Sequence, residues 1–379
     1  MRRSSERILT THVGSLPGLS RFDPSRPDYP QQVAAGVAEV VARQREARLD
    51  VINEGEYAKA GDWLSYVDDR FTGFEPREPT GTPIILQGKD REAFADFYAY
   101  ATAKGTLFYA ASEDIKPKRQ HWVCTGPIAY KGQAATQREI ELLKGNLKPG
   151  EEGFLTATAP SSLEPYWRNE HYPSEEAFIF AFAEALRVEY EMIAASGLIL
   201  QVDDAWLPAL WDRIGLQMGL AAFRKRSLLR VDALNHALRN IPEDRVRYHL
   251  CWGSWHGPHA YDIEMRDMVD VMLAVRAQAY LFEAANARHE HEFVVWDDVK
   301  LPRGKIIVPG VVTHSTDVVE HPELVAQRIR RFAQRVGHEN VMAGCDCGFG
   351  GRSHPQIAWA KLNSLTQGAA LASETLFRR

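Results

Sequence analysis

The sequence has little cysteine, no long apolar run and no large excess of charge of either sign. Its four cysteines among 379 residues are too few for a disulfide framework, so we expect free thiols, metal ligands or packing residues. No apolar stretch approaches the roughly 20 residues that span a bilayer, and no membrane segment is expected. The 45 basic and 50 acidic side chains form no block of like charge, so we expect no binding to nucleic acid.

The sequence also lacks signals that would target or divide the chain. Residues 1–15 contain no apolar core of a secretory signal, which predicts a cytoplasmic protein. No internal repeat, low-complexity tract or long Ser/Gly/Pro-rich linker occurs. The length suits one large α/β barrel or two ordinary domains, and without a linker we expect residues 1–379 to form a single domain.

Short apolar runs alternate with long helical patterns. A helix is predicted from Ser174, its N-cap, to Gly197, just before the buried strand 198–202. Another begins at Pro322 and ends at Gly337, again before an apolar run. This repetition of helix and strand predicts a parallel sheet.

Nine segments are candidates for barrel strands. They are predicted near residues 11–15, 51–54, 122–126, 154–157, 198–203, 248–251, 279–283, 306–311 and 341–345. We predict an eight-stranded (β/α)8 barrel, the TIM barrel, in which one segment is accessory, either the first or the one at Phe154. A doubly wound open sheet is the rival fold, but no GxGxxG turn follows the first strand.

Residues 61–121 fit no plain step from strand to helix. This segment is rich in tyrosine, phenylalanine and aspartate. We predict an insertion after the second strand that is either a lid or a contact within a homo-oligomer.

Candidate metal ligands stand at the ends of three predicted strands. Residues i and i+2 of a strand point the same way, so His249 and Cys251 can reach one ion. Glu283 closes another strand, and Cys345 and Cys347 close the last. Zinc takes four such N, S or O donors, or three with an exchangeable fourth in a catalytic site. Donors on separate strands favour a catalytic zinc site at the barrel face where active sites lie.

Several motifs together resemble one family. The turn Thr11-His12-Val13-Gly14-Ser15-Leu16-Pro17, the segment Asn53-Glu54-Gly55-Glu56-Tyr57, the triplet His249-Leu250-Cys251 and the triplet Asp346-Cys347-Gly348 resemble the C-terminal catalytic barrel of the cobalamin-independent methionine synthase superfamily. The run 249–259, HLCWGSWHGPH, together with Gly350-Gly351-Arg352 and residues 356–361, is similar to the epoxyalkane:coenzyme M transferase branch. The similarity covers nearly the whole chain.

The resemblance implies a set of zinc ligands. These are His249, Cys251 and Cys347, with Glu283 as an exchangeable carboxylate. Cys345 is the competing choice, but Cys347 alone lies in the Asp-Cys-Gly pattern.

The resemblance also implies roles for residues that bind or protonate substrate. His314 corresponds to the proton donor for the leaving group, and Glu56 and Asp203 correspond to carboxylates that hold an amino group. The stretch Asp204-Ala205-Trp206 stands where those enzymes have Glu-Pro-Ala, so the loop after Asp203 departs from the family pattern. Both carboxylates can equally be N-caps of the following helices.

Other candidates have weaker patterns. His256 and His259 are further proton-donor candidates, and the Ser15 turn can offer its N–H to a substrate carboxylate or sulfonate. The glycine-rich loop 348–352 can cradle an anion or be a bent connection. Cys124 has no partner in the pattern and is expected to be a packed or loop thiol. The run 288–292 has metal-ligand residue types, but they are sequential in a predicted loop.

The implied ligand set suits thiol activation. Two thiolates, one neutral imidazole and Zn²⁺ sum to about zero charge, so a bound substrate thiol can lose its proton and stay electron-rich. We predict a zinc-dependent thiol alkyltransferase that methylates homocysteine or a similar thiol in methionine biosynthesis, with a small-molecule thiol and an alkyl donor as partners. The alternative enzyme adds a thiol to an epoxide. The alternative of another class is a non-catalytic zinc-stabilised barrel or a decarboxylase-like relative.

Overall fold

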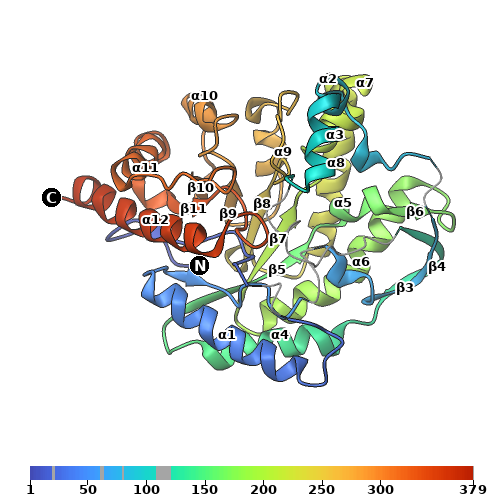
Figure 1. Cartoon of the computed structure of the whole chain (residues 1–379), viewed down its shortest axis with the longest axis horizontal. Helices are drawn as coiled ribbons and strands as arrows, with labels where there is room; N and C mark the ends of the chain where they lie inside the picture. Colours follow the sequence, from blue (N-terminus) through green and yellow to red (C-terminus); the bar gives the residue numbers. More distant parts are fainter. Residues whose placement is uncertain (19–21, 60–63, 79–80, 108–120, 379) are drawn as a thin grey trace.

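Eight parallel strands form a nearly closed barrel. The computed structural model describes residues 1–18, 22–59, 64–78, 81–107 and 121–378. The sheet has the order β1-β11-β10-β9-β8-β7-β5-β2. The Asp50 amide donates to the Thr10 carbonyl at 3.0 Å across the seam between β1 and β2. The strands are β1 Leu9–Thr10, β2 Val51–Ile52, β5 Glu152–Thr158, β7 Ile199–Asp204, β8 Val246–Leu250, β9 Ala279–Phe282, β10 Ile306–Val312 and β11 Met342–Cys345. The predicted (β/α)8 barrel is confirmed (Figure 1).

Helices cover the outside of this sheet. The longer ones are α1 Tyr29–Glu46, α4 Gln133–Asn146, α6 Glu175–Ala195, α8 Leu220–Ala237, α11 Pro322–Val336 and α12 Pro355–Leu376, and the short ones are α5 Pro160–Leu163, α7 Leu216–Met218, α9 Val269–Leu273 and α10 Val295–Asp298. The two predicted helix starts are confirmed. The Ser174 hydroxyl accepts from the Ala177 amide at 3.1 Å, and α11 begins at Pro322 behind a His321 cap. No helix in the described part of the chain is both long and apolar enough to cross a bilayer.

Buried side chains fill the interior of the barrel. Every residue of β7, β8, β9 and β10 is buried, as expected for strands that helices cover from outside. Polar residues inside are paired. Arg247 donates to Gln201 Oε1 at 2.6 Å and to Thr11 Oγ1 at 2.9 Å. The carboxyl ends of the strands are therefore the place where polar side chains can meet a substrate.

The prediction of the accessory strand is wrong. The first strand, which lies at residues 9–10 rather than 11–15, and the strand that contains Phe154 both belong to the barrel. The accessory segment is β4 (Trp122–Tyr130), which pairs with β3 (Phe71–Pro76) and β6 (Trp167–Asn169) in a separate sheet. The second half of β4 alternates between more and less exposed residues, whereas a barrel strand such as β7 is buried throughout. An apolar start made β4 resemble a barrel strand in the sequence.

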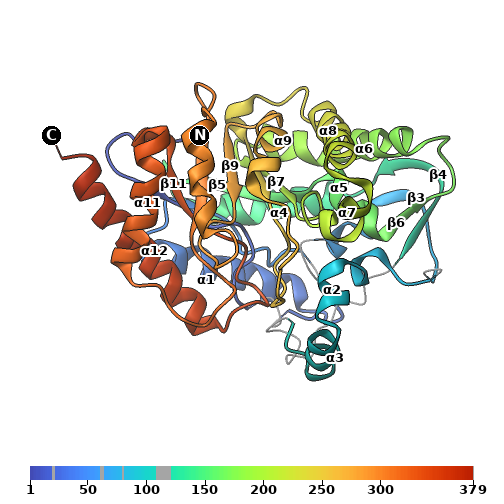
Figure 2. The ribbon, with the colours of Figure 1, turned by 90° about the horizontal axis from the view of Figure 1, so that it is seen from above.

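The insertion after β2 packs on the loop that follows β8. Besides β3, its described part holds α2 (Lys89–Ala93) and α3 (Ala95–Lys104), which lie together beside the barrel in Figures 1 and 2. The Ala260 amide donates to Asp90 Oδ1 at 2.9 Å, and Trp255 Nε1 donates to the Tyr98 hydroxyl at 3.1 Å. Part of the predicted range 61–121 lies outside the described residues. Its role as a lid or an oligomer contact stays a prediction, as does the single domain.

Candidate metal centre and active site

Three side chains from two strand ends converge on one point. His249 lies near the end of β8, Cys251 follows that strand, and Cys347 follows β11. One ligand atom of each lies within 4.8 Å of the other two, and the two sulfur atoms are 3.9 Å apart. All three residues are buried. The structure thus brings together the histidine and two thiols that the sequence singled out for one metal ion.

One ring nitrogen of His249 has a hydrogen-bond partner, and the other has none among the described residues. Nδ1 lies 2.9 Å from Asp203 Oδ1, which also accepts from Gln201 Nε2 at 2.7 Å. Nε2 is buried and has no partner in the described part of the structure. A buried nitrogen without a partner is costly, and a metal ion at the cluster would satisfy it.

The two thiols differ in acidity. A hydrogen bond from Cys251 lowers the pKa of Cys347 to about 5, and the charge of Arg352 acts in the same direction. That hydrogen bond and burial raise the pKa of Cys251 well above its usual value. Cys347 is therefore the more acidic of the two thiols. A divalent cation would stabilise both as thiolates, the form in which cysteine binds metals.

A carboxylate adjoins the cluster without being part of it. Glu283 follows β9, and its Oε1 lies 3.7 Å from Cys251 Sγ while accepting from the Trp252 amide at 2.9 Å. Burial raises the Glu283 pKa to about 7. It is not among the residues that share the 4.8 Å span. One imidazole, two sulfurs and a neighbouring carboxylate fit a zinc ion with an exchangeable fourth position.

The remaining cysteines lie apart from the cluster. Cys345, the last residue of β11, is not part of the group that Cys347 forms with His249 and Cys251. The Cys345 sulfur instead accepts from the Val13 amide at 3.3 Å, and burial raises its pKa. Cys124 lies in β4, where its thiol donates to the Gly126 carbonyl at 3.3 Å. The geometry favours Cys347 as the second sulfur ligand.

His314 follows β10 and is buried among positive charges. Burial, then Arg352 and His256, lower the pKa of His314 well below its usual value. Its Nδ1 and the Nε2 of His256 have no partner among the described residues. In contrast, the ring nitrogens of His259 lie 3.0 Å from Asp262 and 3.0 Å from a backbone carbonyl. His314 and His256 therefore offer a nitrogen to a substrate, and His259 does not.

Carboxyl groups gather beside Asp203. Thr156 Oγ1 donates to the Glu56 carboxylate at 3.1 Å, and burial followed by the charge of Asp203 raises the Glu56 pKa to about 8. Glu54 lies in the same sequence motif as Glu56 but was not predicted as a site residue. Glu54 is buried, neither of its carboxyl oxygens has a partner in the described structure, and burial raises its pKa to about 7. A substrate ammonium group would pair with these carboxyls.

The predicted Ser15 turn packs against the loop that carries Cys347. The amides of Phe349 and Gly350 donate to the Ser15 carbonyl at 2.9 Å and 3.1 Å. A Cβ added to Gly348 would lie 2.2 Å from Ser15 Oγ, so this close approach requires glycine. Ser15 thereby helps to fix the position of Cys347, and its binding of a substrate anion stays a prediction.

Asp346 and Asn286 are supporting residues that the sequence analysis missed. Asp346 Oδ1 accepts from the amides of Ala284 and Ala285, each at 2.8 Å. Asn286 Nδ2 donates to Glu283 Oε2 at 2.8 Å and to Asp346 Oδ2 at 3.2 Å. These bonds hold Glu283 next to the cluster. The signal in the sequence was the place of Asp346 in the Asp-Cys-Gly pattern.

The run 288–292 forms a charged network instead of a second metal group. His289 lies 3.2 Å from an Asp262 oxygen and 2.8 Å from a Glu292 oxygen. Burial lowers the pKa of His289, but hydrogen bonds to these two carboxylates raise it to about 10. A protonated imidazole between two carboxylates is not a metal ligand.

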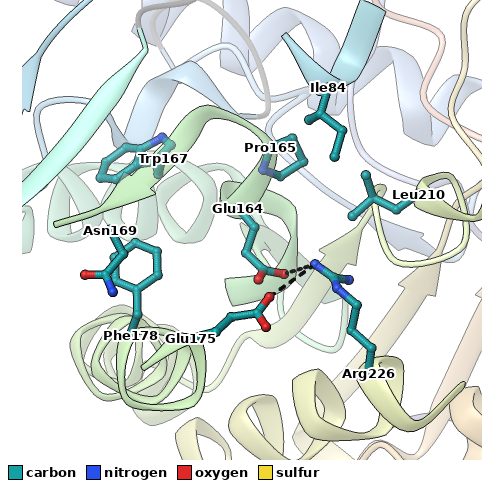
Figure 3. Close-up of a pocket in the computed structure, with 9 residues that line it drawn as sticks. All are labelled: Ile84, Glu164, Pro165, Trp167, Asn169, Glu175, Phe178, Leu210 and Arg226. Atoms are coloured by element: carbon teal, nitrogen blue, oxygen red, sulfur yellow. Dashed lines mark hydrogen bonds and ion pairs between the residues drawn. The ribbon is translucent and has the colours of Figure 1, made fainter. Parts of the chain in front are cut away.

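A separate pocket of about 270 Å³ lies beside the accessory sheet (Figure 3). Its wall is mostly apolar, and Arg226 lies 3.2 Å from Glu164 and 3.8 Å from Glu175 within it. None of the predicted site residues lines it. Because its charged groups already pair with one another, we place the chemistry at the cluster.

Comparison with known sequences gives long matches at low identity. No family model matches the chain. The 5-methyltetrahydropteroyltriglutamate–homocysteine methyltransferases of Vibrio harveyi and Yersinia pseudotuberculosis are 22% and 24% identical to it. Each match covers 97% of this chain and 43% of the relative, so the chain spans less than half the length of these relatives.

Comparison with solved structures shows a shared fold. A B12-independent methionine synthase from Shewanella sp. W3-18-1, in complex with selenomethionine, has a TM-score of 0.72 at 17% identity and covers 98% of this chain and 99% of its own. A Listeria monocytogenes protein described as a vitamin-B12-independent methionine synthase has a TM-score of 0.64 at 17% identity, over 96% of this chain and 98% of its own. Closeness to the epoxyalkane:coenzyme M transferase branch stays a prediction. Matches along nearly the whole chain and the common barrel thus make this chain similar in sequence and fold to cobalamin-independent methionine synthases.

Proposed function

We propose that the chain is a zinc-dependent alkyltransferase that transfers a methyl group to the sulfur of homocysteine or a similar small thiol. The observation that carries this proposal is the buried convergence of His249, Cys251 and Cys347 within 4.8 Å. These residues would hold the metal, and Glu283, 3.7 Å from Cys251 Sγ, would supply a carboxylate beside it. When bound, zinc lowers the pKa of a substrate thiol and so provides a nucleophile at neutral pH.

Asp203 positions the imidazole for that task. Its carboxylate accepts from His249 Nδ1, so the proton stays on Nδ1 and the lone pair of Nε2 is available as a ligand. A carboxylate behind a ligating histidine also raises its basicity. Gln201 donates to the same Asp203 oxygen and keeps it in place.

Glu54 and Glu56 provide acceptors for a substrate amino group. Both are buried, and burial raises their pKa values to about 7 and about 8, although the charge of Lys59 acts in the opposite direction. An ammonium group placed between them would lower both pKa values and form charge-assisted hydrogen bonds. An amino acid thiol such as homocysteine supplies that group.

His314 provides the proton for the leaving group. Transfer forms a sulfur–carbon bond and breaks the bond from that carbon to the donor atom, which keeps the electron pair and needs a proton. Burial and then the charge of Arg352 hold the pKa of His314 low. A substrate with negative charge near Arg352 would offset this effect and raise the His314 pKa toward the value that suits a general acid.

Addition of a thiol to an epoxide is a second candidate. It needs the same thiol nucleophile and a proton for the opening alkoxide, so the cluster and His314 would serve it as well. The positive charge of Arg352 near Cys347 favours a thiol that carries an anionic group. The carboxyl groups around Asp203 favour instead a thiol that carries an amino group.

A direct test combines a substrate screen with matched cysteine variants. Zinc-loaded protein is incubated with homocysteine, other small thiols, and several methyl donors and epoxides, and products are identified by mass spectrometry. Methylated thiol from the wild type and Cys345→Ala, but not from Cys251→Ala or Cys347→Ala, would support the proposal. Zinc retention in all three cysteine variants would overturn the ligand assignment.

A further inference from the structure

Arg352 is held beside the cluster by neutral partners. Its Nε donates to the Ser254 hydroxyl, and its Nη1 donates to the Gly350 carbonyl at 2.9 Å. No carboxylate within the described ranges forms an ion pair with it. A guanidinium that keeps its charge without a counter-ion is suited to bind an external anion.

Two buried imidazole nitrogens lie near this guanidinium without partners. Among the described residues, nothing satisfies Nε2 of His256 or Nδ1 of His314. Only 3% of His314 is exposed to solvent. Buried ring nitrogens normally find a hydrogen-bond partner, so these two point to a ligand.

The positive charge of Arg352 acts on both imidazoles and on one thiol of the cluster. Burial and then its charge lower the pKa of His256, and the same two causes lower that of His314. Its charge also acts on Cys347, next to a hydrogen bond from Ser254. The guanidinium therefore lies within electrostatic range of the predicted metal-binding sulfur.

We propose that Arg352, Ser254 and His256 form a subsite for the oxyanion group of a substrate, a carboxylate, sulfonate or phosphate. This inference rests on the proposed thiol alkylation at the adjacent cluster. The planar guanidinium can offer parallel N–H donors to such a group, and a protonated His256 can add one through Nε2. The Ser254 hydroxyl accepts from Arg352 Nε and holds the guanidinium in place. The anion belongs either to the thiol or to the alkyl donor. A thiol would also bind the metal through its sulfur, whereas an alkyl donor would not.

A matched set of probes separates these cases. Calorimetry of the zinc-loaded protein measures the Kd of 3-mercaptopropionate, which has an anionic end, and of 2-mercaptoethanol, which has none. Methanesulfonate, an anion without a thiol, is measured alongside. The variants are Arg352→Gln and, as a control, Arg335→Gln, whose arginine lies on α11 and pairs with Asp297 of α10 at 2.9 Å. Circular dichroism confirms that both variants fold.

We expect the wild type and Arg335→Gln to bind the anionic thiol about tenfold or more tightly than the neutral one, and Arg352→Gln to lose this preference. If the thiols bind equally but methanesulfonate binding depends on Arg352, the subsite serves the alkyl donor. If no probe depends on Arg352, the proposal is overturned. Zinc-edge X-ray absorption is recorded with the same thiols. If methanesulfonate binding depends on Arg352 but no thiol changes this spectrum, the subsite stands and the proposed alkylation is rejected.

Discussion

Asp203 Oδ1 lies 2.9 Å from His249 Nδ1, across two parallel strands on which residues 203 and 249 are in direct register. The barrel thus sets the orientation of the imidazole through its own strand pairing. This pairing assigns Asp203 a positioning role in addition to the amino-group contact that the sequence resemblance implied.

We expect Asp203→Asn to weaken zinc binding by about 10- to 100-fold because the amide no longer fixes the His249 tautomer. Competition with a fluorescent zinc chelator measures the affinity. Asp204→Asn is the matched control, since Asp204 is the next residue of β7 and accepts from Tyr248 and Ser161 instead. Equal zinc affinity of Asp203→Asn and wild type would contradict the role.

Cys251→Ala and Cys347→Ala should each lose zinc, whereas Cys345→Ala should keep one zinc per chain. The first two remove a thiol from the 3.9 Å sulfur pair, while Cys345 contacts the Val13 amide away from it. Metal analysis of the purified variants by mass spectrometry decides the matter. Zinc loss only in Cys345→Ala would reverse the assignment.

His314→Asn should retain zinc and slow turnover by about 100-fold or more, the scale of a lost general acid. Its kcat should also lose the pH dependence of the wild type, which a merely structural change would leave in place. His291→Asn, at an exposed position, serves as the control. Wild-type turnover by His314→Asn would require another proton donor, with His256 the next to test.

Protein stability should fall between pH 5.5 and 8 because of Glu56. Its pKa of about 8 in the folded protein exceeds the ordinary 4.5, so the folded state binds more protons than the unfolded state in this range. Glu56→Gln should reduce this fall in the free energy of unfolding by about 1 kcal/mol or more, as followed by urea unfolding.

The control for this pH effect is Glu151→Gln. Arg45 lowers the pKa of Glu151, so its contribution to stability is already complete above the ordinary pKa and should not vary between pH 5.5 and 8. A wild type whose stability is flat over this range would contradict the Glu56 prediction.

The sequence predicted the barrel and the members of the cluster well, because strand ends and alternation are local properties. His249 and Cys251 follow from one strand, and Cys347 from its motif. The choice against Cys345 needed the structure, which shows that its sulfur accepts from the Val13 amide and that Cys347 lies in the cluster. The prediction that β4 belongs to the barrel was wrong because a half-exposed strand can begin with the same apolar residues as a buried one.

Long-range pairing was not predictable in the same way. That Asp346 binds the amides of Ala284 and Ala285, or that Glu54 lacks any partner in the described structure, depends on where distant strands meet. Neither residue has a pattern of its own that separates it from other buried acids.

Zinc-edge X-ray absorption tests the central claim most directly. Purified zinc-loaded protein should show two sulfur ligands and one imidazole with a fourth light atom, and addition of homocysteine or another accepted thiol should raise the sulfur count to three. A spectrum without sulfur ligands, or one that no thiol changes, would contradict the account.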